Sequence, residues 1–150
     1  MKTGKKNFRY LEGKNPEEML FTSSHWISEM QFFSDEQKFF KNALTNFTLA
    51  VLEGHKLEEV RKLVIKISAS EKEQKILLHR LKLHKKDLEK IMENPNTTEE
   101  VNCRKEHFAL LLNIRLFKKN FRKLKKDLFQ ILIAVLKIQN QRVLIGPNVI

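Results

Sequence analysis

The fold is decided by residues 103–138, which read CRKEHFALLLNIRLFKKNFRKLKKDLFQILIAVLKI. Within this stretch, apolar side chains, together with one cysteine and one histidine, recur at alternating intervals of four and three residues. The positions are Cys103, His107, Leu110, Ile114, Phe117, Phe121, Leu124, Leu128, Ile131, Val135 and Ile138. This spacing places all of them on one face of an α-helix. It therefore predicts one long helix that packs through a coiled-coil-like seam.

The residues on either side set the limits of this helix at 98–142. Asn94-Pro95-Asn96 ends a preceding helix, and Thr97 with Glu100 matches a capping box that starts the next one. Gly146-Pro147 stops any continuation of the helix.

Two more helices with the same periodicity precede it. The first is predicted to begin at Ser23 or Ser24 and to end at Gly54, and the second to span residues 56–93. The first seam comprises Trp26, Met30, Phe33, Gln37, Phe40, Leu44, Phe47 and Val51. The second comprises Leu57, Val60, Val64, Ile67, Gln74, Leu78 or Leu77, Leu81, Leu88 and Met92. Gln37 is the only break in the first seam. The second seam weakens around Glu71 and Gln74, which indicates a local polar layer or a wide, partly wet seam.

Short connections between long helices force neighbouring helices to run antiparallel. We therefore expect an all-α fold, an antiparallel up-down-up bundle of three long helices with heptad seams. Residues 1–22 are predicted to be a flexible basic tail, in which Asn15-Pro16 starts a short docking helix. Residues 23–142 form the bundle, and residues 143–150 form a C-terminal tail.

The composition excludes several classes of protein. The chain has 150 residues, 41% of them hydrophobic, and a net charge of +11, so it is too apolar for a disordered chain. The longest apolar run, residues 129–138, is too short to cross a bilayer, and we expect no signal peptide. Cys103 is the only cysteine, which favours the reducing cytoplasm. Catalytic and phosphate-binding motifs are absent from the sequence, so we expect neither enzymatic activity nor a cofactor.

The helices carry more apolar residues than one seam each can bury. The surplus residues are Phe32, Phe39, Phe129, Leu132, Ile133 and Leu136. Exposed together they would form an adhesive patch, so something must cover them. The expected cover is a second copy of the chain or another helical protein. The alternative is self-coverage by residues 19–21, 143–145 or 149–150.

One polar cluster is a candidate metal site. If the chain is folded back at Gly54 and at Pro95, His84 lies level with His25 and with His107. His25 has a second potential ligand, Glu29, four residues away on its own helix, and His107 likewise has Cys103. Imidazole and thiolate groups at that spacing can share a metal ion. The alternative is that a buried thiol and self-satisfied histidines serve only the core.

A second candidate site is a row of cations on the third helix. It comprises Arg115, Lys118, Lys119, Arg122, Lys123, Lys125 and Lys126, all off the seam. We name this row the basic ridge. Such a ridge suits the phosphates of nucleic acid, although it also fits an ordinary solvated face. An anionic membrane surface is disfavoured because the apolar face of the helix is needed for the core. The preferred hypothesis is therefore a non-catalytic, self-associating interaction or scaffold protein, with polyanion binding and metal binding as alternatives.

Overall fold

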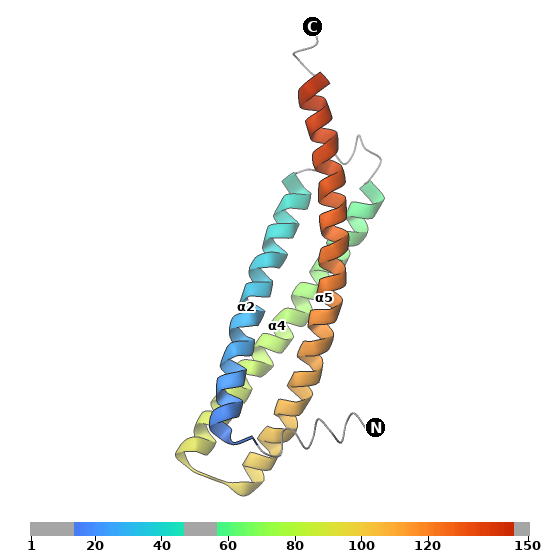
Figure 1. The fold of residues 1–150 in the computed structure, drawn as a ribbon. Helices are drawn as coiled ribbons and strands as arrows, with labels where there is room; N and C mark the ends of the chain where they lie inside the picture. The colour runs from blue at the N-terminus through green and yellow to red at the C-terminus, as the bar shows by residue number, and fades with distance from the viewer. Residues whose placement is uncertain (1–13, 47–56, 146–150) are drawn as a thin grey trace. The chain divides into compact units, whose positions relative to one another are not determined.

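The computed structural model describes residues 14–46 and 57–145, and these residues form three α-helices without any strand (Figure 1). The helices are α2 (Pro16–Asn46), α4 (Leu57–Glu93) and α5 (Thr97–Ile145). The second runs antiparallel to the other two, and the three pack against one another. The all-α, up-down-up three-helix bundle predicted from the periodicity is confirmed. The predicted seam positions Phe47 and Val51, and the turn at Gly54, lie outside the described residues.

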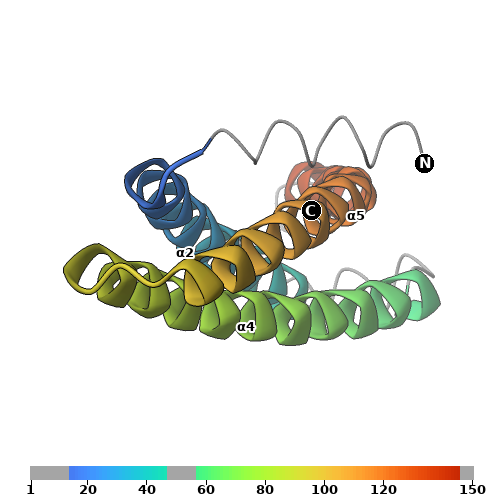
Figure 2. The same cartoon turned by 90° about the horizontal axis from the view of Figure 1, so that it is seen from below.

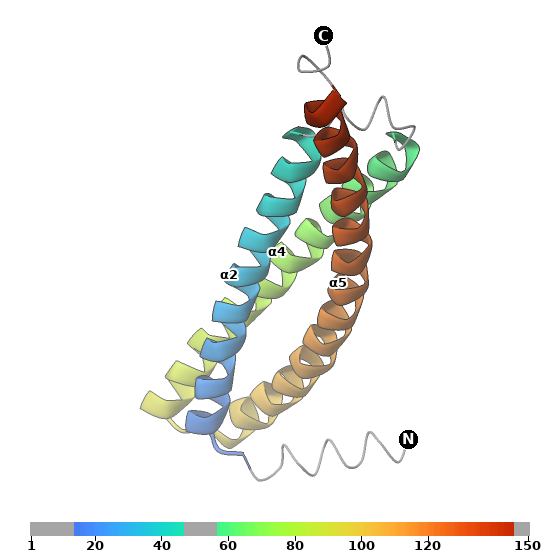
Figure 3. The ribbon, with the colours of Figure 1, turned by 45° about the horizontal axis from the view of Figure 1, so that its top comes forward.

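The chain divides into two compact units, and each helix contributes a part to both. Unit 1 comprises Met1–Phe33 and Glu73–Lys118, and unit 2 comprises Ser34–Lys72 and Lys119–Ile150. Figure 2 is viewed from the end at which a short connection, part of unit 1, joins α4 to α5. Figure 3 turns the opposite ends of the helices toward the viewer, and its colour bar locates residues 34–46, 57–72 and 119–145 of unit 2 along them.

The core of unit 1 follows the predicted seams closely. Its buried apolar side chains are Met19, Trp26, Met30, Leu77, Leu81, Leu88, Ile91, Cys103, Leu110, Ile114 and Phe117. The rings of Phe33 and Phe117 lie 5.5 Å apart between their centroids. Burial of each large side chain stabilises the fold by roughly 1.5–3 kcal/mol. The prediction was wrong at Met92, which is exposed, because the neighbouring Ile91 enters the core instead.

The core of unit 2 is built in the same way. Its buried apolar residues are Phe40, Leu44, Val60, Leu63, Ile67, Phe121, Leu124, Leu128, Ile131, Leu132 and Val135. Val64, which the seam of the second helix included, is only partly buried, and Leu63 takes the core position. A helix rotates by about 100° per residue, so adjacent residues compete for the same seam and periodicity alone cannot separate them.

The prediction placed two helix starts too late. In the third helix, α5, the capping residue is Asn96 and not Thr97, since the backbone N–H of Glu99 donates to Asn96 Oδ1 at 3.2 Å. In the first helix, Asn15 Oδ1 accepts the N–H of Glu18 at 2.8 Å, so α2 begins at Pro16 instead of at Ser23 or Ser24. Ser23 is instead buried mid-helix. An asparagine supplies the side-chain acceptor that a first turn needs.

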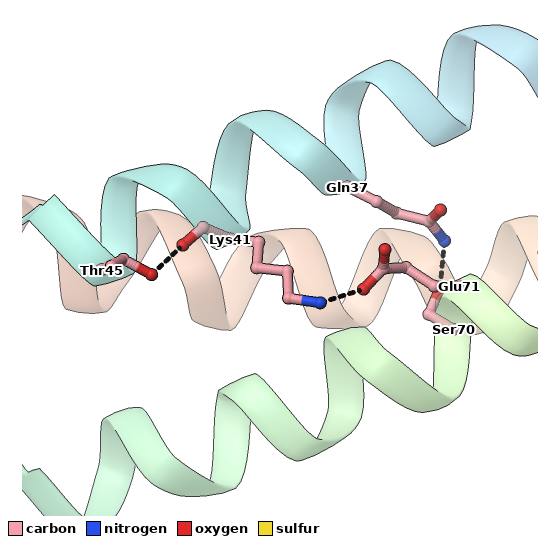
Figure 4. A network of polar contacts seen from close by, with 5 residues as sticks. All are labelled: Gln37, Lys41, Thr45, Ser70 and Glu71. Carbon is pink, nitrogen blue, oxygen red and sulfur yellow. Dashed lines mark hydrogen bonds and ion pairs between the residues drawn. The ribbon is translucent and has the colours of Figure 1, made fainter.

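Polar seam residues form hydrogen bonds between helices. In unit 2, the buried Gln37 side chain donates through Nε2 to Ser70 Oγ at 2.8 Å, and Lys41 Nζ lies 3.1 Å from Glu71 Oε1 beside it (Figure 4). In unit 1, Gln74 Nε2 donates to the Met30 carbonyl at 2.9 Å. Each glutamine amide therefore donates to a partner on another helix, Gln37 in unit 2 and Gln74 in unit 1.

None of the described helices contains a stretch that is both long and apolar enough to span a membrane.

Candidate functional site

The structure brings two of the predicted site residues into direct contact in unit 1. His84 Nε2 and His107 Nδ1 lie 2.9 Å apart, and both side chains are buried, with 2% and 1% of their surface exposed. The Trp26 ring stacks on His107, with 4.7 Å between ring centroids and 29° between planes. The two histidines lie level with each other, as counting residues from the connection at Pro95 predicts.

Burial keeps both rings neutral at pH 7. Desolvation, together with the smaller effects of the neighbouring His84 and Lys14, lowers the pKa of His107 to about 3. Desolvation also lowers the pKa of His84, although Glu106 and Asp87 oppose that shift. Two neutral imidazoles can share one hydrogen bond, in which one ring donates and the other accepts. The second ring nitrogen of His84, Nδ1, is buried and has no hydrogen-bond partner among the described residues.

The five predicted metal ligands do not come together. His25 has 69% of its side chain exposed and pairs with Glu29 at 3.3 Å, and Glu29 also pairs with Lys118 at 2.6 Å. His84, Cys103 and His107 are all buried instead. Within residues 14–46 and 57–145, no group of three or more histidine, cysteine or acidic side chains is placed to hold a metal ion.

The Cys103 thiol is held in its protonated form. Desolvation, together with the smaller effects of the carboxylates of Asp87, Glu99, Glu100 and Glu106, raises its pKa to about 11. A protonated, buried thiol is a poor nucleophile. Cys103 therefore behaves as a small core residue, and it packs with Met19, Leu88 and Ile91.

A cavity of about 310 Å³ lies beside the histidine pair. Its lining is supplied by α4 and α5 and comprises His84, Asp87, Lys90, Ile91, Glu99, Asn102, Cys103 and Glu106. Sequence reasoning found His84 and Cys103 but missed the acidic residues. The available signal was their spacing, because Asp87 follows His84 by one helical turn and Glu99 and Glu106 lie about one turn on either side of Cys103.

The basic ridge is exposed over most of its length but partly neutralised. In unit 1 Lys118 pairs with Glu29 at 2.6 Å, while Arg115 is exposed. In unit 2 Lys125 pairs with Glu36 at 3.1 Å, and its Nζ lies 5.2 Å from the centroid of the Phe121 ring. The other members in unit 2 have no ion-pair partner in the described part of the chain; they are Lys119, Arg122, Lys123 and Lys126.

The surplus apolar residues are divided between the two units. Phe32 is exposed in unit 1, whereas Leu132 is buried in unit 2, so the prediction that Leu132 belongs to an exposed surface was wrong. Leu132 lies four residues after Leu128 and three before Val135, both buried, and so shares their face of the helix. The remaining four lie in unit 2 and are between 43% and 61% exposed, and we name them the unit 2 patch: Phe39, Phe129, Ile133 and Leu136.

One buried ring connects the two helices that carry the unit 2 patch. The Phe40 ring makes edge contacts with Phe39, at 5.4 Å between centroids, and with Phe129, at 5.0 Å. Ile133 and Leu136 follow Phe129 by one and two turns of α5. The four exposed side chains therefore form one apolar surface over α2 and α5.

No protein-family model matches the chain, and no curated protein or solved structure shows significant similarity to it.

Proposed function

We propose that the protein is a non-catalytic interaction or scaffold protein that self-associates through the unit 2 patch. The observation that carries this proposal is the clustering of four large, exposed apolar side chains on either side of the buried Phe40 ring. Each such side chain gains about 1.5–3 kcal/mol when it is removed from water. A contiguous exposed patch of this kind is typical of a protein interaction site.

The described parts of the chain do not supply a cover for this patch. Met19, from the segment that was considered as a cover, is fully buried in the core of unit 1 with Leu88. Residues 143–145 belong to α5. At 1.5 Å per residue, Val143 therefore lies about 21 Å along the helix from Phe129 and cannot fold back onto it. Residues 149–150 lie outside the described residues.

We propose that a second copy of the chain covers the unit 2 patch, and the charge of unit 2 makes this proposal testable. Lys119, Arg122, Lys123 and Lys126 are exposed on the same helix as Phe129, in a chain of net charge +11. Two copies that meet through their patches bring like charges closer together. Added salt screens that repulsion, so self-association should become tighter as the salt concentration rises.

Sedimentation velocity on the double variant Phe39→Gln/Phe129→Gln tests the proposal. We expect the wild-type chain to form a species of at least twice the monomer mass, and the double variant to remain monomeric and helical. Ile65→Gln is the matched control, because Ile65 is 69% exposed on α4 of the same unit and lies outside the patch. A wild-type chain that stays monomeric at high concentration and high salt would refute self-association. Truncation after Ile145 shows whether residues 146–150 cover the patch instead.

A second candidate function is the binding of a polyanion such as nucleic acid by the basic ridge. The observation that favours it is the run of exposed cations in unit 2 that lack a carboxylate partner in the described residues. Phosphate contacts of this kind give an affinity that falls steeply with salt. We expect Lys119→Ala/Lys123→Ala to weaken oligonucleotide binding and to lower the salt slope by about two.

The matched control for that experiment is Lys62→Ala/Lys66→Ala, which removes the same charge from exposed positions on α4. Equal binding by the two double variants would show that net charge, and not the ridge, attracts the polyanion. The opposite salt dependences of self-association and of polyanion binding separate the two candidate functions. For location we propose the reducing cytoplasm, which is supported by Cys103 being a free, buried thiol.

A further inference from the structure

One side of α4 in unit 1 combines cations with exposed apolar side chains. The Ile76 and Leu83 residues are 61% and 48% exposed, and they lie three residues before and four residues after the exposed His79. This spacing places the three side chains on the same side of the helix. Three exposed lysines lie within one turn of them. We name the six residues the α4 face: Lys75, Ile76, His79, Lys82, Leu83 and Lys86.

The lysines of the α4 face are not neutralised by the protein. None of the three has an ion-pair partner within the described residues. The basic ridge on α5 differs in this respect, because its Lys118 pairs with Glu29 and its Lys125 pairs with Glu36. The chain as a whole carries a net charge of +11. The α4 face therefore presents positive charge that an external anionic surface can neutralise.

The core of unit 1 does not use the two apolar residues of the α4 face. Leu77 and His84, each the next residue along the helix, are the buried ones, with 7% and 2% of their surface exposed. A step of one residue rotates a side chain by about 100° around the helix. The seam of α4 can therefore pack in the core while Ile76 and Leu83 stay outside it. Removal of these two side chains from water requires an apolar environment that the described residues do not supply.

The shape of the α4 face favours a flat surface as its partner. All six side chains belong to a single helix, so the face is convex, and none of them lines the cavity beside the histidine pair. A partner helix or peptide is usually held in a groove or along the edge of a sheet. The phosphates of nucleic acid could pair with the lysines but would leave Ile76 and Leu83 in water. A bilayer surface offers both anionic headgroups and an apolar interior.

We propose that the α4 face binds the surface of a bilayer that contains anionic phospholipids. The lysines pair with the headgroups, and Ile76 and Leu83 enter the boundary between the headgroups and the acyl chains. Interfacial helices bind in this way, with basic residues beside the apolar side chains that are inserted. Anionic lipids give the cytoplasmic leaflet of a membrane its negative potential, which agrees with the location proposed above. This proposal does not depend on self-association, which we assign to unit 2.

Cosedimentation of the full chain with vesicles tests the proposal. We expect binding to vesicles of equal parts phosphatidylcholine and phosphatidylserine, and little binding to vesicles of phosphatidylcholine alone. Lys82→Gln/Lys86→Gln should weaken the binding about 25-fold, since each lysine near an anionic surface contributes about fivefold. The matched control is Lys119→Gln/Lys123→Gln, which removes the same charge from the basic ridge and should have a smaller effect.

A second double variant tests the insertion of the apolar side chains. Ile76→Gln/Leu83→Gln should weaken binding to the anionic vesicles about tenfold or more, because two side chains lose their transfer from water. The same variant should leave oligonucleotide binding unchanged. Phe21→Gln is its control, because Phe21 is 79% exposed on α2 of the same unit and lies outside the α4 face. All the substituted positions are exposed, so the variants are expected to fold, and circular dichroism checks that they do.

Four results would each overturn the proposal. The first is an absence of binding to the anionic vesicles, and the second is an equal loss in the two lysine double variants, which would show that net charge alone attracts the chain. The third is wild-type vesicle binding by Ile76→Gln/Leu83→Gln. The fourth is a Lys82→Gln/Lys86→Gln variant that loses oligonucleotide binding but keeps vesicle binding, which would assign the α4 face to nucleic acid. Phe39 and Phe129 are intact in every variant, so sedimentation velocity on the same samples tests self-association separately.

Discussion

Acidification below pH 6.5 should destabilise the protein, because His84 and His107 are buried in their neutral forms. The pKa of His107 is lowered to about 3 from the model-peptide value of 6.5, and that of His84 is also lowered. In the unfolded chain both histidines bind protons below pH 6.5, while the folded chain excludes them. Stability is therefore complete above pH 6.5 and is lost as the pH falls from 6.5 toward the folded pKa values.

The size of the effect follows from proton linkage. One pH unit below 6.5, each histidine that stays neutral in the folded state lowers the free energy of unfolding by about 1.4 kcal/mol. His107 therefore lowers it by about 1.4 kcal/mol at pH 5.5, and His84, whose pKa is also lowered by burial, adds to this loss. This is a large fraction of the stability of a small domain, which is about 5–15 kcal/mol.

Chemical denaturation between pH 7.5 and 5.5 measures this loss, and the fluorescence of Trp26 reports it directly because its ring stacks on His107. We expect His107→Gln to reduce the change in unfolding free energy between these pH values by about 1.4 kcal/mol, the contribution of His107. His25→Gln is the control, because the His25 side chain is 69% exposed, and it should keep the wild-type slope. An unfolding free energy that does not change between pH 7.5 and 5.5 would refute the inference that both rings are neutral and buried.

Three substitutions test the packing, the helix start and the surface electrostatics, each by the midpoint of urea unfolding. Phe40→Ala should cost about 3–5 kcal/mol, because the ring is 2% exposed and contacts Phe39 and Phe129; a loss below 1 kcal/mol would contradict its place in the core. Asn96→Ala should cost about 1 kcal/mol, since Glu99 N–H loses its acceptor, whereas Thr97→Ala at the rejected cap position should cost less. Glu71→Gln should cost less than about 1 kcal/mol, because its partner Lys41 is about half exposed.

Periodicity predicted the fold because burial of an apolar stripe dominates helix packing. Of the α5 seam, the positions from Cys103 to Val135 are all buried, and Ile138 is partly so. Periodicity predicted the wrong core residue where two adjacent residues were both apolar, as at Ile91 and Met92, because either of them could occupy the same seam position. Helix starts were displaced because serine, threonine and asparagine can all cap, and the choice among them depends on backbone geometry.

The candidate sites were less predictable because they depend on side chains from different helices. Counting from the connection at Pro95 brought His84 and His107 to the same level. Counting from Gly54 placed His25 in that cluster, although its side chain is exposed beside Glu29. The level of a residue along the bundle follows from its distance in sequence from a turn, whereas the direction of its side chain depends on how its helix is rotated about its own axis. Spacing shows that acidic residues lie about one turn from His84 and from Cys103, whereas their gathering around one cavity depends on which faces of α4 and α5 meet.

The mass of the chain in solution as a function of salt tests the proposed function most directly. Sedimentation equilibrium at low and at high sodium chloride should show a monomer that becomes a dimer or larger species as salt rises, because the unit 2 patch attracts while the cations of unit 2 repel. A monomeric mass at every salt concentration, with Phe39 and Phe129 intact, would contradict it.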